Sequence, residues 1–302
     1  MKVLITGITG FLGSQLAEDQ INKGNTVYGT KRNSSSLERC KTFSDKIIWI
    51  NLEDKNWRQV IITFKPELFI HAAWEGVGAA DRYNWQVQLK NIDLTLALLE
   101  IANAVKATKF IGFGSQAEYG FFTGKIDENY PVNPVNAYGL AKNITSKLIK
   151  SYCEQNDMNW YWLRLFSFFG EKESENWFIP SVIKNIYNNV PMDMTPGMQR
   201  YAYMYVNDLT NIIGRIIDSS IKSDVYNISS NETFKLKTIV EKIIKIVNPT
   251  KPQINFGVLA YRDNQPMLIQ GDTRKLSNEL GEIVETDFDE NLFNVVKYII
   301  KK

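Results

Sequence analysis

A tyrosine and a lysine four residues apart, Tyr138 and Lys142, are the residues whose spacing most directly suggests catalysis. Side chains at i and i+4 share one face of a helix. A lysine ammonium near a tyrosine hydroxyl stabilises the phenolate and lowers a pKa that is about 10 in water. Such a tyrosine transfers a proton to or from an alcohol oxygen while hydride moves at the adjacent carbon. Ser115, at the end of a predicted strand, is placed to hydrogen-bond that same oxygen. Ordinary amphipathic helices show the same spacing. The pair therefore indicates catalysis only in combination with the other motifs of the chain.

The N-terminal stretch predicts a binding site for a dinucleotide. Lys2–Thr6 is a short apolar run typical of a buried strand, and Ser14–Lys23 has the apolar spacing of a helix. In the turn between them, Gly7 allows the tight bend, Gly10 lets the backbone approach a pyrophosphate, and Gly13 lets the helix pack closely on the strand. The unpaired N–H groups at the start of the helix would then face the phosphates.

Two cations, Lys31 and Arg32, follow the second predicted strand. In an NAD-binding fold an acid near this point accepts hydrogen bonds from the ribose 2′-hydroxyl. Here the run from Thr30 to Ser34 contains no acid, and two cations suit a 2′-phosphate instead. We therefore predict NADP(H) in preference to NAD(H), although two solvated surface cations would look the same in the sequence.

Strand and helix patterns alternate through the first half of the chain, which predicts an α/β fold with a doubly wound parallel sheet, covered by helices on both faces. The predicted strands are Lys2–Thr6, Thr26–Thr30, Lys46–Ile50, Leu68–Ala72, Phe110–Phe113 and Trp160–Phe166. The predicted helices are Ser14–Lys23, Lys55–Phe64, Trp85–Val105 and Asn136–Glu154. Ligands bind at the carboxyl ends of the strands in such folds, so polar residues just after each strand are the first candidates for function.

After about Gly170 the pattern loosens, and a smaller C-terminal lobe is expected to meet the first half at a cleft. We predict an NADP-binding Rossmann domain over residues 1–170 and a mainly substrate-binding lobe over residues 171–302, with residues 207–228 returning to the Rossmann domain. Helices are expected at Asn176–Asn189, Asp208–Ser219, Phe234–Val247 and Asp289–Lys301, strands at Tyr201–Val206 and Val225–Ile228, and loops at Asn188–Gly197 and Asn248–Gly257.

Composition excludes several classes of function. The net charge of +2 gives no reason to expect a nucleic acid or a membrane surface as partner. No apolar run approaches the roughly 20 residues that span a bilayer, and the N-terminus lacks the pattern of a signal peptide, so we expect a cytoplasmic protein. Cys40 and Cys153 indicate neither a disulfide framework nor a thiolate metal site. The single histidine, His71, argues against a zinc site and against a Ser-His-Asp hydrolase.

Taken together, the motifs resemble those of the extended short-chain dehydrogenases, which include the sugar-nucleotide epimerases, dehydratases and ketoreductases. They extend over nearly the whole chain. They are Thr6-Gly7-x-x-Gly10-Phe11-Leu12-Gly13, His71-Ala72-Ala73, Gly114-Ser115-Gln116-Ala117-Glu118-Tyr119-Gly120, Tyr138-x-x-x-Lys142, Leu163-Arg164-Leu165-Phe166-Ser167-Phe168-Phe169-Gly170, Tyr205-Val206-Asn207-Asp208 and Tyr226-Asn227-Ile228-Ser229.

The resemblance implies a catalytic triad of Ser115, Tyr138 and Lys142, with Lys142 also holding the nicotinamide ribose. The implied cofactor contacts are Gly7, Gly10, Phe11, Leu12 and Gly13 at the pyrophosphate, Asn51 and Leu52 near the adenine, and Ala72 and Ala73 along the cofactor. Asn91 would open the family's N-x-x-x-T-x-x-L-L helix pattern, which Thr95, Leu98 and Leu99 complete.

The resemblance also implies contacts to the substrate diphosphate. Arg262 matches an arginine that binds it, whereas Arg200 lies one residue before the family's other arginine, which falls at Tyr201. Either arginine would look the same as a solvated surface cation. Gln116 and Trp74 would contact sugar hydroxyls, although Trp74 is equally well explained as a packed loop aromatic.

Departures from the family's motifs reduce the number of reactions that this chain is expected to catalyse. The 4,6-dehydratases follow their catalytic Thr or Ser with Asp-Glu, because dehydration needs an acid and a base. Gln116 and Ala117 occupy those positions here, and neither transfers a proton. The bifunctional epimerase-reductases of GDP-fucose synthesis carry a cysteine where this chain has Ala117, so epimerisation beside the ketone is disfavoured as well.

Two reactions remain. A C4 epimerase of the UDP-galactose type keeps NAD bound and usually carries an acid where this chain has Lys31. A 4-ketoreductase instead uses NADPH once and releases NADP. We therefore expect NADPH-dependent reduction of the 4-keto group of a nucleotide-diphosphate-linked 4-keto-6-deoxy or 3,6-dideoxy sugar, in surface-polysaccharide biosynthesis. Within the family, the motifs are most similar to those of reductases of the CDP-abequose synthase type.

The alternatives are an NAD-dependent nucleotide-sugar 4-epimerase and a non-catalytic dinucleotide-binding regulator. Regulators of this kind often lose the Tyr or the Lys, and both are present here. The family's dimers imply a homodimer formed through the helices Trp85–Val105 and Asn136–Glu154.

Overall fold

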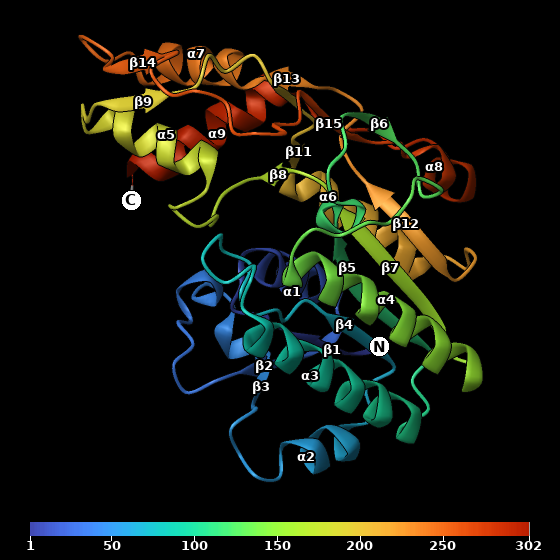
Figure 1. Ribbon diagram of the computed structural model, residues 1–302. Coiled ribbons are helices and arrows are strands. Elements are labelled where there is room, and N and C mark those ends of the chain that lie inside the picture. Colours follow the sequence, from blue (N-terminus) through green and yellow to red (C-terminus); the bar gives the residue numbers. More distant parts are fainter. Residues whose placement is uncertain (302) are drawn as a thin grey trace.

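The computed structural model describes residues 1–301, and its centre is a sheet of seven strands (Figure 1). The strand order is β12-β7-β5-β4-β1-β2-β3, and every neighbouring pair is parallel. The strands are β1 (Lys2–Thr6), β2 (Thr26–Lys31), β3 (Ile47–Asn51), β4 (Leu68–His71), β5 (Lys109–Ser115), β7 (Asn159–Leu165) and β12 (Asp224–Ile228). The predicted doubly wound parallel sheet is confirmed, with the reversal of strand order between β1 and β4.

Helices cover both faces of this sheet because the strands are apolar on both sides. Along β1, Val3 and Ile5 join the core under one set of helices, whereas Leu4 joins the core under the other. The first set is α1 (Phe11–Asn22), α6 (Val206–Asp218) and α8 (Arg274–Leu280), and the second is α2 (Trp57–Phe64), α3 (Trp85–Ala104) and α4 (Ala137–Gln155). In Figure 1, α3 and α4 lie side by side in front of the sheet.

A second group of elements builds the C-terminal part of the molecule. Its core is formed by α5 (Phe178–Tyr187), α7 (Leu236–Val247) and α9 (Phe288–Lys301), which lie together at the top of Figure 1. The smaller strands are β6 (Gly124–Ile126), β8 (Phe168–Phe169), β9 (Met192–Met194), β10 (Arg200–Tyr201), β11 (Met204–Tyr205), β13 (Phe234–Lys235), β14 (Ile254–Phe256) and β15 (Leu268–Gly271). The short 3-10 helices are η1 (Glu38–Cys40), η2 (Ser44–Lys46) and η3 (Gln116–Tyr119). The proposed domain boundary near residue 170 stays a prediction.

Several boundaries differ from the prediction. The expected strand Tyr201–Val206 is wrong, because the chain changes partner within it: Ala202 N–H bonds Ile269 O, whereas Met204 N–H bonds Ser167 O. Val206 already begins α6. The predicted loops Asn188–Gly197 and Asn248–Gly257 contain β9 and β14, which pair in parallel with each other.

The fifth strand is longer than predicted and ends at Ser115. Of its two glycines, Gly112 lies within the predicted strand, whereas Gly114 hides the last residues of the strand, because glycine is depleted in strands. The structure explains both glycines, since a side chain at either position would collide with Trp162 of the neighbouring β7. None of the helices within residues 1–301 combines the length and apolarity needed to cross a bilayer.

Candidate active site

Ser115, Tyr138 and Lys142 meet where β5 ends against the first turns of α4. Asn136 begins α4 by accepting the N–H of Gly139 at 2.9 Å, and this cap sets the position of Tyr138 in the first turn. The hydroxyl of Ser115 lies close enough to the Tyr138 phenol to lower the pKa of that phenol. The structure therefore brings the three predicted catalytic residues together.

The electrostatic environment of Tyr138 differs from the expectation. Burial is the largest influence and raises the pKa of Tyr138, and the carboxylate of Glu118 acts in the same direction. The hydroxyl of Ser115 and the charge of Arg82 lower this pKa but do not offset burial. The net lowering expected from the spacing of Tyr138 and Lys142 is therefore not found, because burial outweighs the groups that favour the phenolate, and the catalytic role of Lys142 stays a prediction.

The amine of Lys142 contacts groups other than the Tyr138 hydroxyl. Its Nζ donates to the carbonyl oxygen of Phe113 at 2.6 Å and lies 3.5 Å from the centre of the Trp74 ring. The distance from Nζ to the centre of the Tyr138 ring is longer, at 5.9 Å. Burial lowers the pKa of Lys142 to about 7, and the charge of Glu118 opposes that shift. The cation–π contact with Trp74 favours the charged form of this buried amine.

A buried ion pair lies directly behind Ser115. Glu118 accepts the backbone N–H of Ser115 at 2.9 Å and the Nε–H of Arg164 at 2.9 Å. Trp162 donates its indole N–H to the same carboxylate at 3.0 Å. Because a buried carboxylate is stable only when it is fully paired, this arrangement holds Ser115 in a defined position. Sequence reasoning quoted Glu118 and Arg164 as motif residues but assigned them no role.

The segment 74–82, after β4, forms the other wall of the cluster. Asn91 of α3 holds it by accepting the N–H of Glu75 at 2.8 Å and donating to the carbonyl oxygen of the same residue at 3.0 Å. Gln88, which is fully buried, accepts the indole N–H of Trp74 at 2.9 Å and donates to Gly76 O at 2.9 Å. The ring of Trp74 meets that of Tyr138 edge-on, with centroids 6.3 Å apart. Trp74 is thus packed against Tyr138 and Lys142, as expected of a packed loop aromatic, and its contact with the sugar stays a prediction.

The predicted glycine turn has the geometry that a dinucleotide phosphate requires. Gly7 has φ +67°, and a Cβ there would lie 2.6 Å from the Cα of Ala73. A Cβ on Gly13 would collide with the carbonyl oxygen of Gly7, so α1 approaches β1 closely only with glycine at this position. No side chain caps α1 at Gly10, which leaves its first-turn N–H groups to a ligand. The residues present fit the pyrophosphate of a dinucleotide.

His71 has a structural position beside this turn. The hydroxyl of Thr95 donates to Asn91 O at 2.7 Å, so it accepts from His71 Nε2–H at 2.9 Å. The hydroxyl of Thr6 accepts from Ala73 N–H at 3.2 Å and donates to His71 Nδ1 at 2.7 Å. Burial lowers the pKa of His71 to about 3, so the ring is neutral and joins β1, β4 and α3.

The cations expected at the adenosine ribose have different environments. Arg32 forms an ion pair with Glu75 at 3.0 Å, and both side chains are about half exposed. The carbonyl oxygen of Lys31 accepts the N–H of Leu52 at 2.9 Å, and Asn51 donates to Asn33 at 2.7 Å. Arg32 therefore has a carboxylate partner already, whereas Lys31 forms no ion pair within residues 1–301.

The predicted substrate contacts are only partly brought together. Gln116 follows Ser115, and its buried Oε1 has no hydrogen-bond partner, which leaves it available to a ligand. Arg200 is exposed and donates to Thr233 O at 2.6 Å. Burial raises the pKa of Tyr201, and the charge of the exposed Arg262 opposes that shift, so Arg262 lies near this side chain. Within the described part of the chain, neither arginine forms a hydrogen bond or ion pair with the catalytic cluster.

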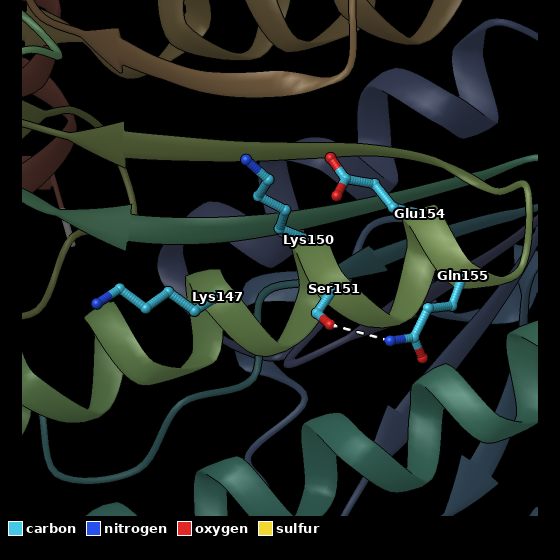
Figure 2. A pocket seen from close by; sticks show the side chains of 5 residues that line it. All are labelled: Lys147, Lys150, Ser151, Glu154 and Gln155. Atoms are coloured by element: carbon cyan, nitrogen blue, oxygen red, sulfur yellow. Dashed lines mark hydrogen bonds between the residues drawn. The ribbon is translucent and has the colours of Figure 1, made fainter.

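Two hollows in the surface lie apart from these residues. A shallow one of about 310 Å³ lies on the outer face of α4, where Figure 2 shows the side chains Lys147, Lys150, Ser151, Glu154 and Gln155. A second, of about 500 Å³, lies between β8, the start of α6 and the segments 230–232 and 282–288. Neither is lined by Ser115, Tyr138 or Lys142. Among residues 1–301 there is also no cluster of three or more metal-ligating side chains.

Comparisons with known proteins agree with this geometry. A profile of the NAD dependent epimerase/dehydratase family matches residues 3–229. The chain is 28% identical over 280 residues to CDP-abequose synthase of Salmonella muenchen, across 91% of this chain and 90% of that protein. It is 27% identical over 282 residues to dTDP-6-deoxy-L-talose 4-dehydrogenase (NAD(+)) of Aggregatibacter actinomycetemcomitans, across 90% of this chain and 99% of that protein. The structure of UDP-glucuronic acid 4-epimerase from Bacillus cereus with UDP-glucuronic acid and NAD covers 100% of this chain and 99% of its own, with a TM-score of 0.88 at 22% identity.

Proposed function

The chain belongs to the NAD-dependent epimerase/dehydratase family, and on that premise we propose that it reduces the 4-keto group of a nucleotide-linked 4-keto-6-deoxy sugar with NADPH. The relatives named above are nucleotide-sugar enzymes by name, and two of them align along about nine tenths of this chain. The proposal goes further than these likenesses in naming the reaction and the cofactor.

The observation that carries the proposal is the closeness of Ser115, at the end of β5, to Tyr138 in the first turn of α4, next to Gln116 and Ala117, which cannot transfer protons. In the reduction, Tyr138 donates its phenolic proton to the oxygen at C4 as the carbonyl becomes an alcohol. Ser115 hydrogen-bonds the same oxygen and so stabilises the charge that develops on it. Gln116 and Ala117 offer no acid or base for removing a C5 proton and a C6 hydroxyl, which argues against dehydration.

The cofactor would be held by the glycine turn and by Lys142. Gly7, Gly10 and Gly13 would surround the pyrophosphate, and Lys142 would bond the nicotinamide ribose. When bound, the dihydronicotinamide supplies the hydride that reduces C4. Lys31, which lacks a carboxylate partner within residues 1–301, would contact a 2′-phosphate. Its charge is the reason for proposing NADPH.

A 4-epimerase is the second candidate, and one observation favours it. The ion pair between Arg32 and Glu75 removes one of the two cations on which the choice of NADPH depends. One relative at 27% identity carries NAD(+) in its name, but it is a 4-dehydrogenase by name, so it bears on the choice of cofactor and not on the choice of an epimerase. An epimerase would use Tyr138 in both directions, as the base and then as the acid, without net consumption of cofactor.

The decisive experiment incubates the purified protein with NADPH or NADH and 4-keto-6-deoxy sugars linked to CDP, dTDP, GDP or UDP. We expect oxidation of one NADPH for each sugar reduced, with a lower rate from NADH, measured by absorbance and by mass spectrometry of the product. Interconversion of C4 epimers of a fully reduced nucleotide sugar, with no net change in cofactor, would instead establish the epimerase. Binding of cofactor without turnover of any sugar would identify a regulator.

A further inference from the structure

Arg82, in the segment between β4 and α3, is in contact with Tyr138 through both its side chain and its backbone. Its guanidinium carbon lies 5.2 Å from the centre of the Tyr138 ring. Its carbonyl oxygen accepts the N–H of Tyr138 at 2.9 Å, a group in the first turn of α4 that has no partner within the helix. Its Nε–H donates to Val77 O at 2.9 Å, which fixes the direction of the guanidinium.

The charge of Arg82 is not neutralised by a carboxylate. Within residues 1–301 it forms no ion pair, whereas Arg164, behind Ser115, is paired with Glu118 at 2.9 Å. The side chain of Arg82 is only partly exposed, so water screens its charge less than that of a surface arginine.

The ionisable and polar groups that face Tyr138 come from four elements. Glu118 of η3 raises the pKa of Tyr138, whereas Ser115 of β5 and Arg82 lower it. Lys142, on α4 itself, is bonded to Phe113 and covered by Trp74. Burial lowers the pKa of Lys142 to about 7, so its positive charge is not fixed across the neutral pH range. A guanidinium stays charged at every pH at which the protein is folded.

We propose that Arg82 is the positioning residue for Tyr138: its guanidinium holds the phenol ring from the side of the 74–82 segment and supplies the permanent positive charge that stabilises the phenolate. This inference rests on the proposed proton transfer by Tyr138. It adds the fixed charge of Arg82 to the influence that the spacing of Tyr138 and Lys142 predicts for Lys142. Since the backbone bond to Tyr138 does not involve the Arg82 side chain, a substitution removes the charge and leaves that bond available.

The test compares Arg82→Met, Arg82→Lys and the control Arg58→Met. Arg58 also lies over an aromatic ring, that of Trp57 at 5.4 Å, but on the exposed surface of α2. The first measurement is the alkaline titration of the Tyr138 phenol in the protein without ligands, obtained as the ultraviolet difference between each protein and its Tyr138→Phe counterpart. We expect Arg82→Met to move the titration upward by about one pH unit, Arg82→Lys to restore most of the shift, and Arg58→Met to leave it unchanged.

The second measurement is the pH dependence of kcat for oxidation of the alcohol product, which requires the phenolate. We expect the acid limb, where kcat rises as Tyr138 loses its proton, to move upward by about one pH unit in Arg82→Met, which corresponds to about a tenfold loss of kcat at neutral pH. An unmoved phenol titration in Arg82→Met would overturn the proposal, as would a higher KM for the nucleotide sugar with an unchanged pH profile, which would make Arg82 a substrate contact. If the wild-type protein turns over no 4-keto sugar, the proposed function fails, while the phenol titration still decides the role of Arg82.

Discussion

Tyr138 is surrounded by groups that act on its hydroxyl in opposite directions. Burial and Glu118 favour the protonated phenol, whereas Ser115 and Arg82 favour the phenolate, and the net effect raises the pKa of Tyr138. A phenol that stays protonated at neutral pH is suited to donate a proton rather than to accept one. This environment agrees with the direction of a reduction, in which the tyrosine acts as the acid.

Replacing Tyr138 by phenylalanine removes this proton donor and keeps the ring. We expect kcat for the reduction to fall by on the order of 10²–10⁴. The affinity for NADPH, measured by fluorescence titration, should change little, because the substitution does not alter the glycine turn that would hold the pyrophosphate. The control is Tyr187→Phe, which alters an exposed tyrosine of α5. Near-normal turnover in Tyr138→Phe would show that another group donates the proton.

At the scale of elements, β5 illustrates how packing positions a reactive side chain. Its glycines admit the Trp162 ring of β7, and Trp162 in turn donates to Glu118, the residue that bonds the backbone of Ser115. The position of Ser115 therefore depends on two neighbouring strands and on η3.

Removal of one partner of the Glu118–Arg164 pair would leave a buried charge unpaired. We expect this to lower the free energy of unfolding by about 3–5 kcal/mol.

His71 links three elements and gives a direct test of this packing. Because the folded pKa of His71 is lowered to about 3, the ring should stay neutral as the pH falls from 8 to 5. The chain contains one histidine, so its Hε1 signal in a proton NMR spectrum reports this group alone. We expect no change in its shift over that range.

The same shift in pKa implies a loss of stability in acid. The unfolded chain protonates its histidine near pH 6.5, whereas the folded chain does so near 3. The unfolded state therefore binds more protons in between, and the contribution of His71 to the free energy of unfolding decreases as the pH falls through that window. A midpoint near 6.5 in the NMR titration of the folded protein would contradict the buried, neutral ring.

At the scale of the whole molecule, α3 and α4 present apolar side chains to solvent. Leu89 is 53% exposed and Leu96 is 39% exposed, one above the other on the outer side of α3. Trp85 at the start of α3 and Ile144 of α4 are also exposed. We name these four residues the α3/α4 stripe. Farther along α4, the side chains exposed in Figure 2 are charged and polar. An exposed group of apolar side chains on two packed helices supports the proposed homodimer.

The proposed dimer can be tested by placing a charge in the α3/α4 stripe. We expect the wild-type protein to sediment as a dimer and Leu89→Glu to sediment as a monomer, because burial of an unpaired carboxylate costs several kcal/mol. The control is Val258→Glu, which alters a residue that is 59% exposed and lies away from α3 and α4. A wild-type monomer in analytical ultracentrifugation, or a Leu89→Glu dimer, would exclude this interface.

The parts of the protein that the sequence alone determined depend on short-range patterns. The apolar strand runs, the glycine turn and the spacing of Tyr138 and Lys142 are local, because a strand or a helix repeats its contacts every few residues. The parallel sheet and the meeting of Ser115 with Tyr138 follow from that repetition and from the short connections of α/β units.

Only the tertiary structure decided which charges act on the phenol. Arg82 has no motif around it, and it reaches Tyr138 because Gln88 and Asn91 hold the preceding segment against α3. Lys142, one helical turn from Tyr138, is turned toward Trp74 and Phe113 instead. Nearness along a helix determines which face a side chain occupies, but electrostatic influence depends on distance, burial and competing partners, which arise from packing between elements far apart in the chain.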